Sequence, residues 1–133
     1  MNTTTDYQIT TKLYESDNSL IYRAILTQNG QKVILKILKE NYPTPAEINR
    51  YKLEYGITCS LNIDGIIKAY DLKRYENSLV MFLEDFGGQS LNLLISKRQF
   101  TLEEFLSIAI KITASLTAVH AASIIHKDIN PSN

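Results

Sequence analysis

The end of the sequence carries the residue spacing with the clearest chemical meaning. Residues 126–133 read His-Lys-Asp-Ile-Asn-Pro-Ser-Asn, so Asp128 is followed five positions later by Asn133. Phosphoryl transfer needs a group that accepts the proton of the attacking hydroxyl and an oxygen ligand for Mg²⁺. The Asp128 carboxylate can do the first and the Asn133 amide oxygen the second. Read without that spacing, an Asp and an Asn beside Pro131 are ordinary turn residues.

A lysine within an apolar strand is the second candidate. Residues 33–38 read Val-Ile-Leu-Lys-Ile-Leu, so Lys36 has apolar neighbours on both faces of the strand. Partial desolvation of its charge is unfavourable without an anionic partner. Glu54, on the helix expected next, can face the sheet and pair with Lys36, whereas Glu47 caps that helix. The alternative is a lysine that reaches water from an edge strand, together with a solvated glutamate.

Composition sets the class of protein. The 133 residues are 44% hydrophobic and 21% charged, typical of one soluble domain, and the 14 basic and 14 acidic residues cancel. A chain without net charge has no general attraction for nucleic acid or anionic membrane. The polar N-terminus lacks a secretory signal, and no apolar run approaches the roughly 18 residues of a membrane span. We therefore expect a cytoplasmic protein without a nucleic-acid partner or membrane span.

Cys59 is the only cysteine, so it has no partner for an intrachain disulfide. This usage fits a reducing compartment. The residue lies in an expected helix beside apolar residues, which favours a buried structural thiol over a nucleophile.

Periodicity and turn residues predict five strands and three helices. The expected strands are Tyr7–Tyr14, Ser19–Leu26, Lys32–Leu38, Ile66–Leu72 and Ser78–Glu84. The expected helices run from a cap at Thr44 to about Leu61, over Leu91–Ser96, and from a cap at Thr101 to about Ala121. The pair Gly87-Gly88 separates the strand-rich part from the helical part, which gives an α+β layout with segments 1–86 and 87–133.

Two motifs together resemble those of protein kinases. Residues 33–36 are similar to the V-A-I-K strand of that family, and residues 126–128 followed by Asn133 are similar to its H-R-D-x-x-x-x-N loop. The order of elements between them is also similar. The resemblance is to the N-terminal part of a Ser/Thr-type protein kinase domain and covers about residues 7–133. Residues 42–45, 60–62 and 84–88 are most similar to the kinase domains of large bacterial hybrid sensor kinases.

The resemblance implies a fold. It is an N-lobe with a five-stranded antiparallel sheet and one αC-type helix, over residues 1–86, followed by the first helices of a truncated helical C-lobe, over residues 87–133. On the long helix we expect an apolar stripe that lacks part of its packing partner. The stripe comprises Leu102, Phe105, Ala109, Ile112, Leu116 and Val119.

The resemblance also implies an ATP site with Mg²⁺. Lys36 would clamp the α- and β-phosphates, and Glu54 would orient it. The backbone of the hinge would bind adenine. Asp128 would accept the substrate hydroxyl proton and Asn133 would hold one Mg²⁺. The hinge residues implied are Leu83, Glu84 and Phe86.

Three features depart from the family pattern: the phosphate-covering loop, residue 130 and the chain end. The phosphate-covering loop before Ile21 has Tyr14, Ser16 and Ser19 where the family has glycines. By the resemblance, Ser16, Ser19 and Ile21 belong to the nucleotide site. Asn130 stands where protein kinases usually carry a lysine that neutralises the transferred phosphate. The D-F-G segment would follow Asn133, so we expect a fragment with little or no kinase activity alone.

Three functions follow as hypotheses. The first is ATP-dependent phosphorylation of a Ser/Thr hydroxyl on a protein substrate in signal transduction, with the remaining C-lobe or downstream sensor domains as further partners. The second is a non-catalytic kinase-like module that binds nucleotide or a partner, suggested by the glycine-free loop and Asn130. The third is a kinase-like phosphotransferase that acts on a small molecule.

Overall fold

The computed structural model describes residues 6–39, 43–75 and 77–132, and these pack as two compact units. The first comprises the described residues up to Ser60 together with Ile67–Phe86. The second comprises Leu61–Ile66 and the described residues from Gly87 onward. The six residues Leu61–Ile66, which follow the first helix along the chain, therefore belong to the second unit.

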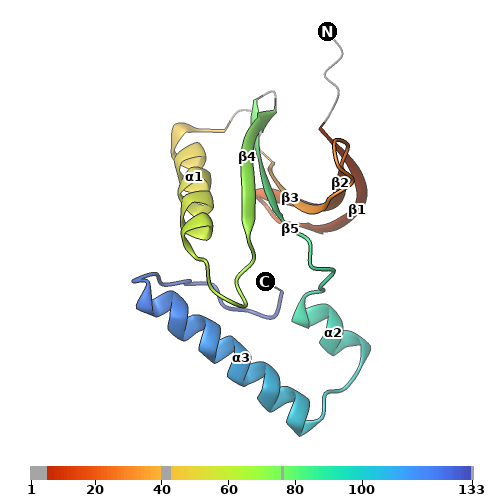
Figure 1. Cartoon of the computed structure of the whole chain (residues 1–133), viewed down its shortest axis with the longest axis vertical. Helices are drawn as coiled ribbons and strands as arrows, with labels where there is room; N and C mark the ends of the chain where they lie inside the picture. Colours follow the sequence, from red (N-terminus) through yellow and green to blue (C-terminus); the bar gives the residue numbers. More distant parts are fainter. Residues whose placement is uncertain (1–5, 40–42, 76, 133) are drawn as a thin grey trace. The chain divides into compact units, whose positions relative to one another are not determined.

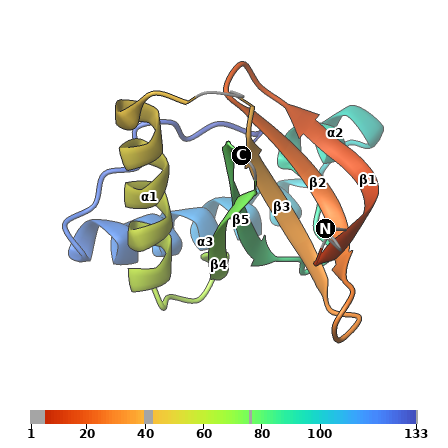
Figure 2. The same ribbon diagram turned by 90° about the horizontal axis from the view of Figure 1, so that it is seen from above.

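The first unit is a five-stranded antiparallel sheet with one helix (Figure 1). The strand order is β1-β2-β3-β5-β4, so β1 and β4 form the two edges. The helix α1 lies on the β4 side of the sheet (Figure 2). This arrangement confirms the expected α+β fold. The elements are β1 (Tyr7–Glu15), β2 (Ser19–Leu26), β3 (Lys32–Leu38), α1 (Pro45–Ser60), β4 (Ala69–Tyr75) and β5 (Ser78–Glu84).

The two faces of β3 contribute to two different apolar clusters, because successive side chains of a strand point to opposite faces. On one face, Val33 and Leu35 are fully buried in a cluster with neighbouring strands. On the other face, Leu38 is buried in a cluster to which α1 contributes Tyr51. The central strand is thus packed on both sides, and the residue between Leu35 and Ile37 points toward the helix side.

The fourth strand begins and ends three residues later than predicted. The sequence predicts Ile66–Leu72, whereas β4 spans Ala69–Tyr75. Before the strand, Gly65 adopts a positive φ of 86°, and the Ile66 N–H donates to the Ile63 carbonyl at 3.1 Å, so this segment forms a turn. At the other end, Tyr75 pairs with Ser78, which carries the strand into its hairpin. A turn signal spread over several residues did not fix this boundary.

The second unit contains two helices, α2 (Leu91–Lys97) and α3 (Leu102–Ala121). Ser90 caps α2, since its hydroxyl accepts a hydrogen bond from the Leu93 N–H at 3.4 Å. At the start of α3 the capping box is complete. The Thr101 hydroxyl accepts from the Glu104 N–H at 3.2 Å, and the Glu104 carboxylate accepts from the Thr101 N–H at 3.0 Å. The predicted cap and helix are therefore confirmed.

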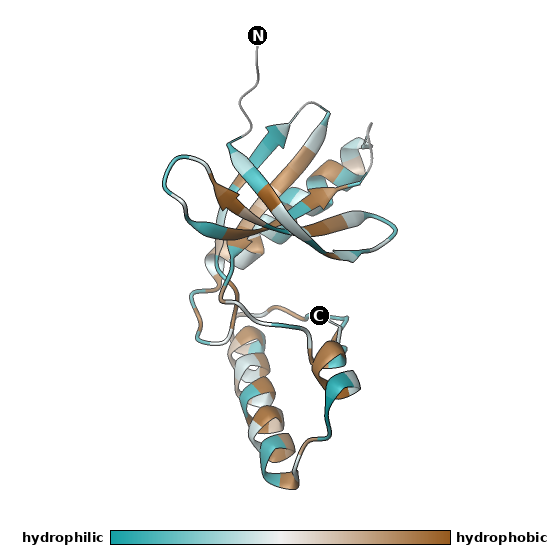
Figure 3. Cartoon of the chain, turned by 90° about the vertical axis from the view of Figure 1, so that its right-hand side faces the viewer, coloured by the Kyte–Doolittle hydropathy of each residue, from teal (hydrophilic) through white to brown (hydrophobic). Residues whose placement is uncertain are grey.

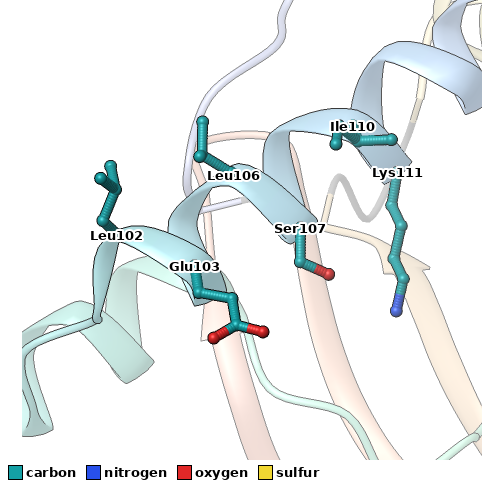
Figure 4. Close-up of a pocket in the computed structure, with 6 residues that line it drawn as sticks. All are labelled: Leu102, Glu103, Leu106, Ser107, Ile110 and Lys111. Carbon is teal, nitrogen blue, oxygen red and sulfur yellow. The ribbon is translucent and has the colours of Figure 1, made fainter.

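The apolar stripe of α3 is open at its start and buried near its end. Leu102 is 72% exposed and Phe105 is also exposed, whereas Val119 is only 5% exposed. The prediction of an unpacked stripe is therefore right for the first turns and wrong for Val119. Figure 3 shows apolar residues along several turns of this helix, and Figure 4 shows Leu102 and Leu106 projecting away from its polar side. Among the described residues, no helix is long and apolar enough to span a membrane.

The prediction of a buried Cys59 is wrong, because this side chain is exposed. It lies in the last turn of α1, where the Sγ atom is 3.7 Å from the Ala69 carbonyl oxygen. Apolar neighbours in the sequence did not reveal which side of the helix end faces solvent.

Candidate active site

Lys36 and Glu54 form an ion pair between the centre of the sheet and α1. The Lys36 Nζ lies 2.5 Å from the Glu54 Oε1. The Lys36 side chain is 23% exposed, so it is largely withdrawn from water yet reachable by a ligand. Such a pair limits the rotation of the ammonium group. The structure therefore brings together the two residues that the sequence predicted as partners.

Tyr51 fixes the backbone beneath this ion pair. It lies three residues before Glu54, on the same side of α1, and its hydroxyl donates to the Lys36 carbonyl oxygen at 2.8 Å. The Lys36 Nζ also lies 5.6 Å from the centre of the Tyr51 ring. Burial, and to a smaller extent the charge of Glu54, raise the pKa of Tyr51 far above its ordinary value, so the hydroxyl stays a donor.

The register of the sheet places apolar neighbours beside the lysine. Ile21 on β2 and Met81 on β5 are the residues directly opposite Lys36. Directly opposite residues in antiparallel strands share a face of the sheet. The Ile21 side chain, predicted for the nucleotide site, therefore emerges on the same face as the Lys36 side chain, while Met81, on the other side of Lys36, is fully buried.

The predicted phosphate-covering residues Ser16 and Ser19 form a tight turn between β1 and β2. The two hydroxyl oxygens are 3.0 Å apart, and the Ser19 N–H donates to the Ser16 Oγ at 3.0 Å. The Ser16 N–H donates to the Ser19 carbonyl oxygen at 2.9 Å. The serines are therefore brought together, but their hydroxyls already satisfy each other and the turn backbone.

Charged residues anchor the same turn to β3. Glu15 accepts from Lys12 on its own strand and forms an ion pair with Lys39, whose Nζ is 2.5 Å from the Glu15 Oε1. The Lys39 N–H also donates to the Asn18 carbonyl oxygen at 3.0 Å. Hydrogen bonds first from Lys12 and then from Lys39 lower the pKa of Glu15 to about 2. A turn held by the contacts of Glu15 and Asn18 with Lys12 and Lys39 therefore stands where the family pattern has glycines.

The expected hinge residues occupy different environments. Leu83, on β5, packs against the cluster beneath α1. The Glu84 N–H donates to the Lys68 carbonyl oxygen at 2.8 Å, and its carboxylate accepts from the Lys68 N–H at 3.3 Å. Phe86 is 74% exposed. The segment therefore leaves the sheet with Leu83 packed in the core, Glu84 hydrogen-bonded to Lys68 just before β4, and Phe86 exposed to solvent.

Arg23 and Asp85 were missed by the sequence interpretation. The Arg23 Nε lies 2.8 Å from the Asp85 Oδ2, and the Asp85 side chain is only 3% exposed. Asp85 lies within the expected hinge, so the pair anchors that segment to β2. An arginine between apolar residues of one strand and an acid directly after another strand were the available signals.

Asp128 lies in a loop held by its own polar groups. The Asp128 N–H donates to the His126 Nδ1 at 3.3 Å, and the Asn130 Nδ2 donates to the Asp128 Oδ1 at 3.0 Å. The Pro131 carbonyl oxygen accepts from the Asn92 N–H at 2.7 Å, which ties the loop to the first turn of α2. The loop thus presents an ionisable carboxylate whose orientation is restrained on one side by an amide.

The predicted metal ligand, Asn133, lies outside the described residues. Within 6–39, 43–75 and 77–132, no cluster of three or more His, Cys, Asp or Glu side chains could hold a metal ion. The amide oxygen of an asparagine is nevertheless a hard oxygen ligand of the kind that Mg²⁺ prefers. A few protein oxygens suffice, since Mg²⁺ also takes substrate phosphates and water as ligands.

Comparison with known proteins identifies the family. The protein kinase domain family matches residues 7–133. A probable serine/threonine-protein kinase of Clostridium perfringens is 26% identical over 96% of this chain and 19% of its own length. The carbon catabolite-derepressing protein kinase of Saccharomyces cerevisiae is 26% identical over 96% of this chain and 20% of its own length. A serine/threonine-protein kinase of Mycobacterium tuberculosis is 25% identical over 85% of this chain and 28% of its own length.

The chain therefore spans about a fifth of the first two relatives and just over a quarter of the third. The match to the family is nonetheless continuous and includes the sheet, α1, both later helices and the loop that carries Asp128. This chain belongs to the protein kinase domain family.

Proposed function

We propose that this domain serves ATP-dependent phosphoryl transfer to a Ser or Thr hydroxyl of a protein substrate. The observation that carries the proposal is the ion pair of Lys36 and Glu54, because it holds a partly buried cation at a fixed place on the sheet. A cation held in this way suits the phosphates of a nucleotide, since phosphoryl transfer depends mainly on positioning and charge neutralisation.

Each residue of the proposed site has one role. Lys36 would neutralise the α- and β-phosphates of ATP, and Glu54 would keep the ammonium in place. Ile21 and the segment that contains Leu83, Glu84 and Phe86 would enclose and bind the adenine. Ser16 and Ser19 would cover the phosphates through their turn backbone, because their hydroxyls are already hydrogen-bonded to each other.

Asp128 would act as the proton acceptor. As the substrate hydroxyl oxygen forms its bond to the γ-phosphorus, the bond from that phosphorus to the ADP oxygen breaks, and the hydroxyl proton passes to the Asp128 carboxylate. Asn133 would hold one Mg²⁺ ion. When bound, the ion neutralises phosphate charge. Asp128 needs a fixed orientation for this role, which the loop contacts at His126 and Asn130 supply.

The test is transfer of labelled γ-phosphate from Mg-ATP to protein by the full-length protein. We expect Asp128→Asn and Lys36→Ala each to lower the rate by at least about a hundredfold. Lys32→Ala is the matched control, because it removes an exposed lysine from the same strand, and its rate should equal that of the wild type. Wild-type rates in both site variants would contradict the proposal.

The wider setting is also proposed. The stretches 42–45, 60–62 and 84–88 support a place in a large bacterial hybrid sensor kinase, where the remaining C-lobe and downstream sensor domains would be partners in signal transduction. A single cysteine suits a reducing compartment, so we propose a cytoplasmic location. Mass spectrometry of the native protein would test the first point, and fractionation of cells would test the second.

A non-catalytic nucleotide-binding module is the second candidate. It is favoured by the Ser16–Ser19 turn, whose hydroxyls are occupied, and by a neutral Asn130 beside Asp128. Thermal unfolding with and without Mg-ATP separates the candidates when combined with the transfer assay. A stabilisation that Lys36→Ala abolishes, in a protein without phosphoryl transfer, would support the module. Transfer that requires Asp128 would contradict it.

A further inference from the structure

The Asn130 side chain uses both ends of its amide within the loop. Its Nδ2 donates to the Asp128 Oδ1 at 3.0 Å. Its Oδ1 accepts from the Ser132 N–H at 2.9 Å. The amide therefore bridges the carboxylate of the expected proton acceptor and the backbone two residues beyond Asn130.

Chemistry determines which end of the amide faces the carboxylate. If the amide were rotated by half a turn, its oxygen would face a carboxylate oxygen and its NH₂ group would face the Ser132 N–H. Both contacts would then be repulsive, so only the observed orientation satisfies both neighbours. A hydrogen bond accepted by a carboxylate is in general stronger than one between neutral groups.

The rest of the loop restrains the backbone on which this amide sits. The Asp128 N–H donates to the His126 Nδ1, and the Pro131 carbonyl accepts from the Asn92 N–H. Lys127, directly before Asp128, has a positive φ of 67°. Because the backbone is held on both sides of Asn130, the amide can restrain rotation of the Asp128 carboxylate rather than move with it.

From this geometry we propose that Asn130 is a positioning residue, which holds the Asp128 carboxylate in one orientation through its NH₂ group. The proposal rests on the proposed function, in which Asp128 accepts the hydroxyl proton. A neutral amide gives this restraint without adding a charge to the loop. The donor end serves the reaction, whereas the acceptor end serves the turn at Ser132.

Substitutions at position 130 separate these two ends. In Asn130→Lys the donor is kept and the acceptor is lost, whereas in Asn130→Asp the acceptor is kept, the donor is lost and a like charge faces Asp128. We expect Asn130→Lys to keep kcat within about threefold, and Asn130→Asp and Asn130→Ala to lower kcat at least about tenfold. The KM for ATP should stay within about twofold in Asn130→Asp and Asn130→Ala, because both ends of the Asn130 amide are hydrogen-bonded within the loop.

A merely structural role gives the opposite order. If only the turn at Ser132 mattered, Asn130→Asp would keep kcat and Asn130→Lys would lose it, and this result would overturn the proposal. The controls are Asn29→Asp and Asn29→Lys, which place the same substitutions at an exposed hairpin asparagine. These controls should not change kcat. All assays use the full-length protein.

A second measurement does not depend on turnover. In the NMR spectrum of the protein labelled at asparagine, the side-chain NH₂ signals of Asn130 should shift when Asp128 is replaced by alanine and stay unchanged when Asp64 is replaced. If the chemical shifts of the Asn130 NH₂ group did not change in Asp128→Ala, the proposed contact would be overturned. A wild-type protein that transfers no phosphate would refute the proposed function, while this spectrum would still decide whether Asn130 holds Asp128.

Discussion

Arg23 and Asp85 join two strands that are not neighbours in the sheet. Arg23 lies on β2 and Asp85 directly follows β5, and β3 runs between them. Arg23 is paired in register with Ile34, and Ile34 with Leu83, so the arginine reaches across one complete strand to the carboxylate. The 2.8 Å contact therefore anchors the proposed adenine-binding segment to the strand that carries Ile21.

Loss of this arginine should destabilise the fold. In Arg23→Ala the Asp85 carboxylate, only 3% exposed, loses its guanidinium partner, and we expect unfolding in urea to become easier by about 2 kcal/mol. Arg98→Ala is the matched control, because Arg98 pairs with Glu104 at the surface, where a pair contributes at most about 1 kcal/mol. Equal effects of the two substitutions would show that the Asp85 carboxylate does not depend on Arg23.

The contrast between the two ion pairs shows what the sequence can predict. Lys36 and Glu54 could be proposed as partners in advance, because strand alternation and helix periodicity allow the contact and the resemblance to protein kinases favours it over a solvated glutamate. Arg23 and Asp85 could not, because their contact depends on the strand order and on which residues lie opposite each other across β3. Local periodicity predicts the face of an element on which a side chain lies. Contacts between strands that are not adjacent depend on the assembled sheet.

The same distinction explains the remaining errors. The start of β4 depends on a turn in which Ile66 bonds to Ile63, and the turn residues alone allowed several boundaries. Exposure of Cys59 depends on the direction in which the last turn of α1 faces. The hydrogen bonds of Asn130 were likewise hidden, because the sequence shows the absence of a charge but not the two contacts that the amide makes.

Glu54 should matter for nucleotide use, whereas Glu47 on the same helix should not. Glu54→Gln removes the charge that holds Lys36. We therefore expect kcat/KM for ATP to fall about tenfold, through a higher KM, a lower kcat or both. Glu47→Gln instead weakens the cap at Thr44 and should affect helix stability alone. Steady-state kinetics of the full-length protein give the comparison. Equal kinetic effects would mean that α1 contributes through its stability only.

The ion pairs of Glu15 predict a pH dependence for the turn between β1 and β2. Because Lys12 and Lys39 lower the pKa of Glu15 from about 4.5 to about 2, the folded state favours the ionised form. The contribution of Glu15 is therefore complete above about pH 4.5 and is lost as the pH falls toward 2. An NMR titration of the Glu15 carboxyl carbon should give a midpoint near 2, and Lys39→Ala should raise it. A midpoint near 4.5 in the wild type would contradict the pairing.

Cys59 should react with a thiol reagent while the protein is folded. Its side chain is exposed, so a disulfide reagent such as DTNB should label one thiol per chain without denaturant. Cys59→Ser should abolish the labelling and leave the stability nearly unchanged, since no buried volume is lost. Labelling that appears only after unfolding would restore the original prediction of a buried thiol.

Gly65 and Ser115 should show a steric coupling within the second unit. Gly65 has a positive φ of 86°, and a Cβ atom at this position would lie 2.4 Å from the Ser115 Oγ on α3. Gly65→Ala should therefore combine a backbone cost of about 1 to 2 kcal/mol with a clash. Gly30→Ala is the matched control, since Gly30 has a positive φ of 71° but nothing lies within 4 Å of where its Cβ atom would be.

The double variant separates the two contributions. In Gly65→Ala with Ser115→Ala the hydroxyl is absent, so we expect the cost of the glycine substitution to fall to about that of Gly30→Ala. Chemical denaturation of the four combinations at positions 65 and 115 gives the coupling free energy directly. A coupling near zero would mean that the turn at Gly65 does not pack against α3 as closely as the structure has it, and the backbone conformation alone would then explain why glycine stands there.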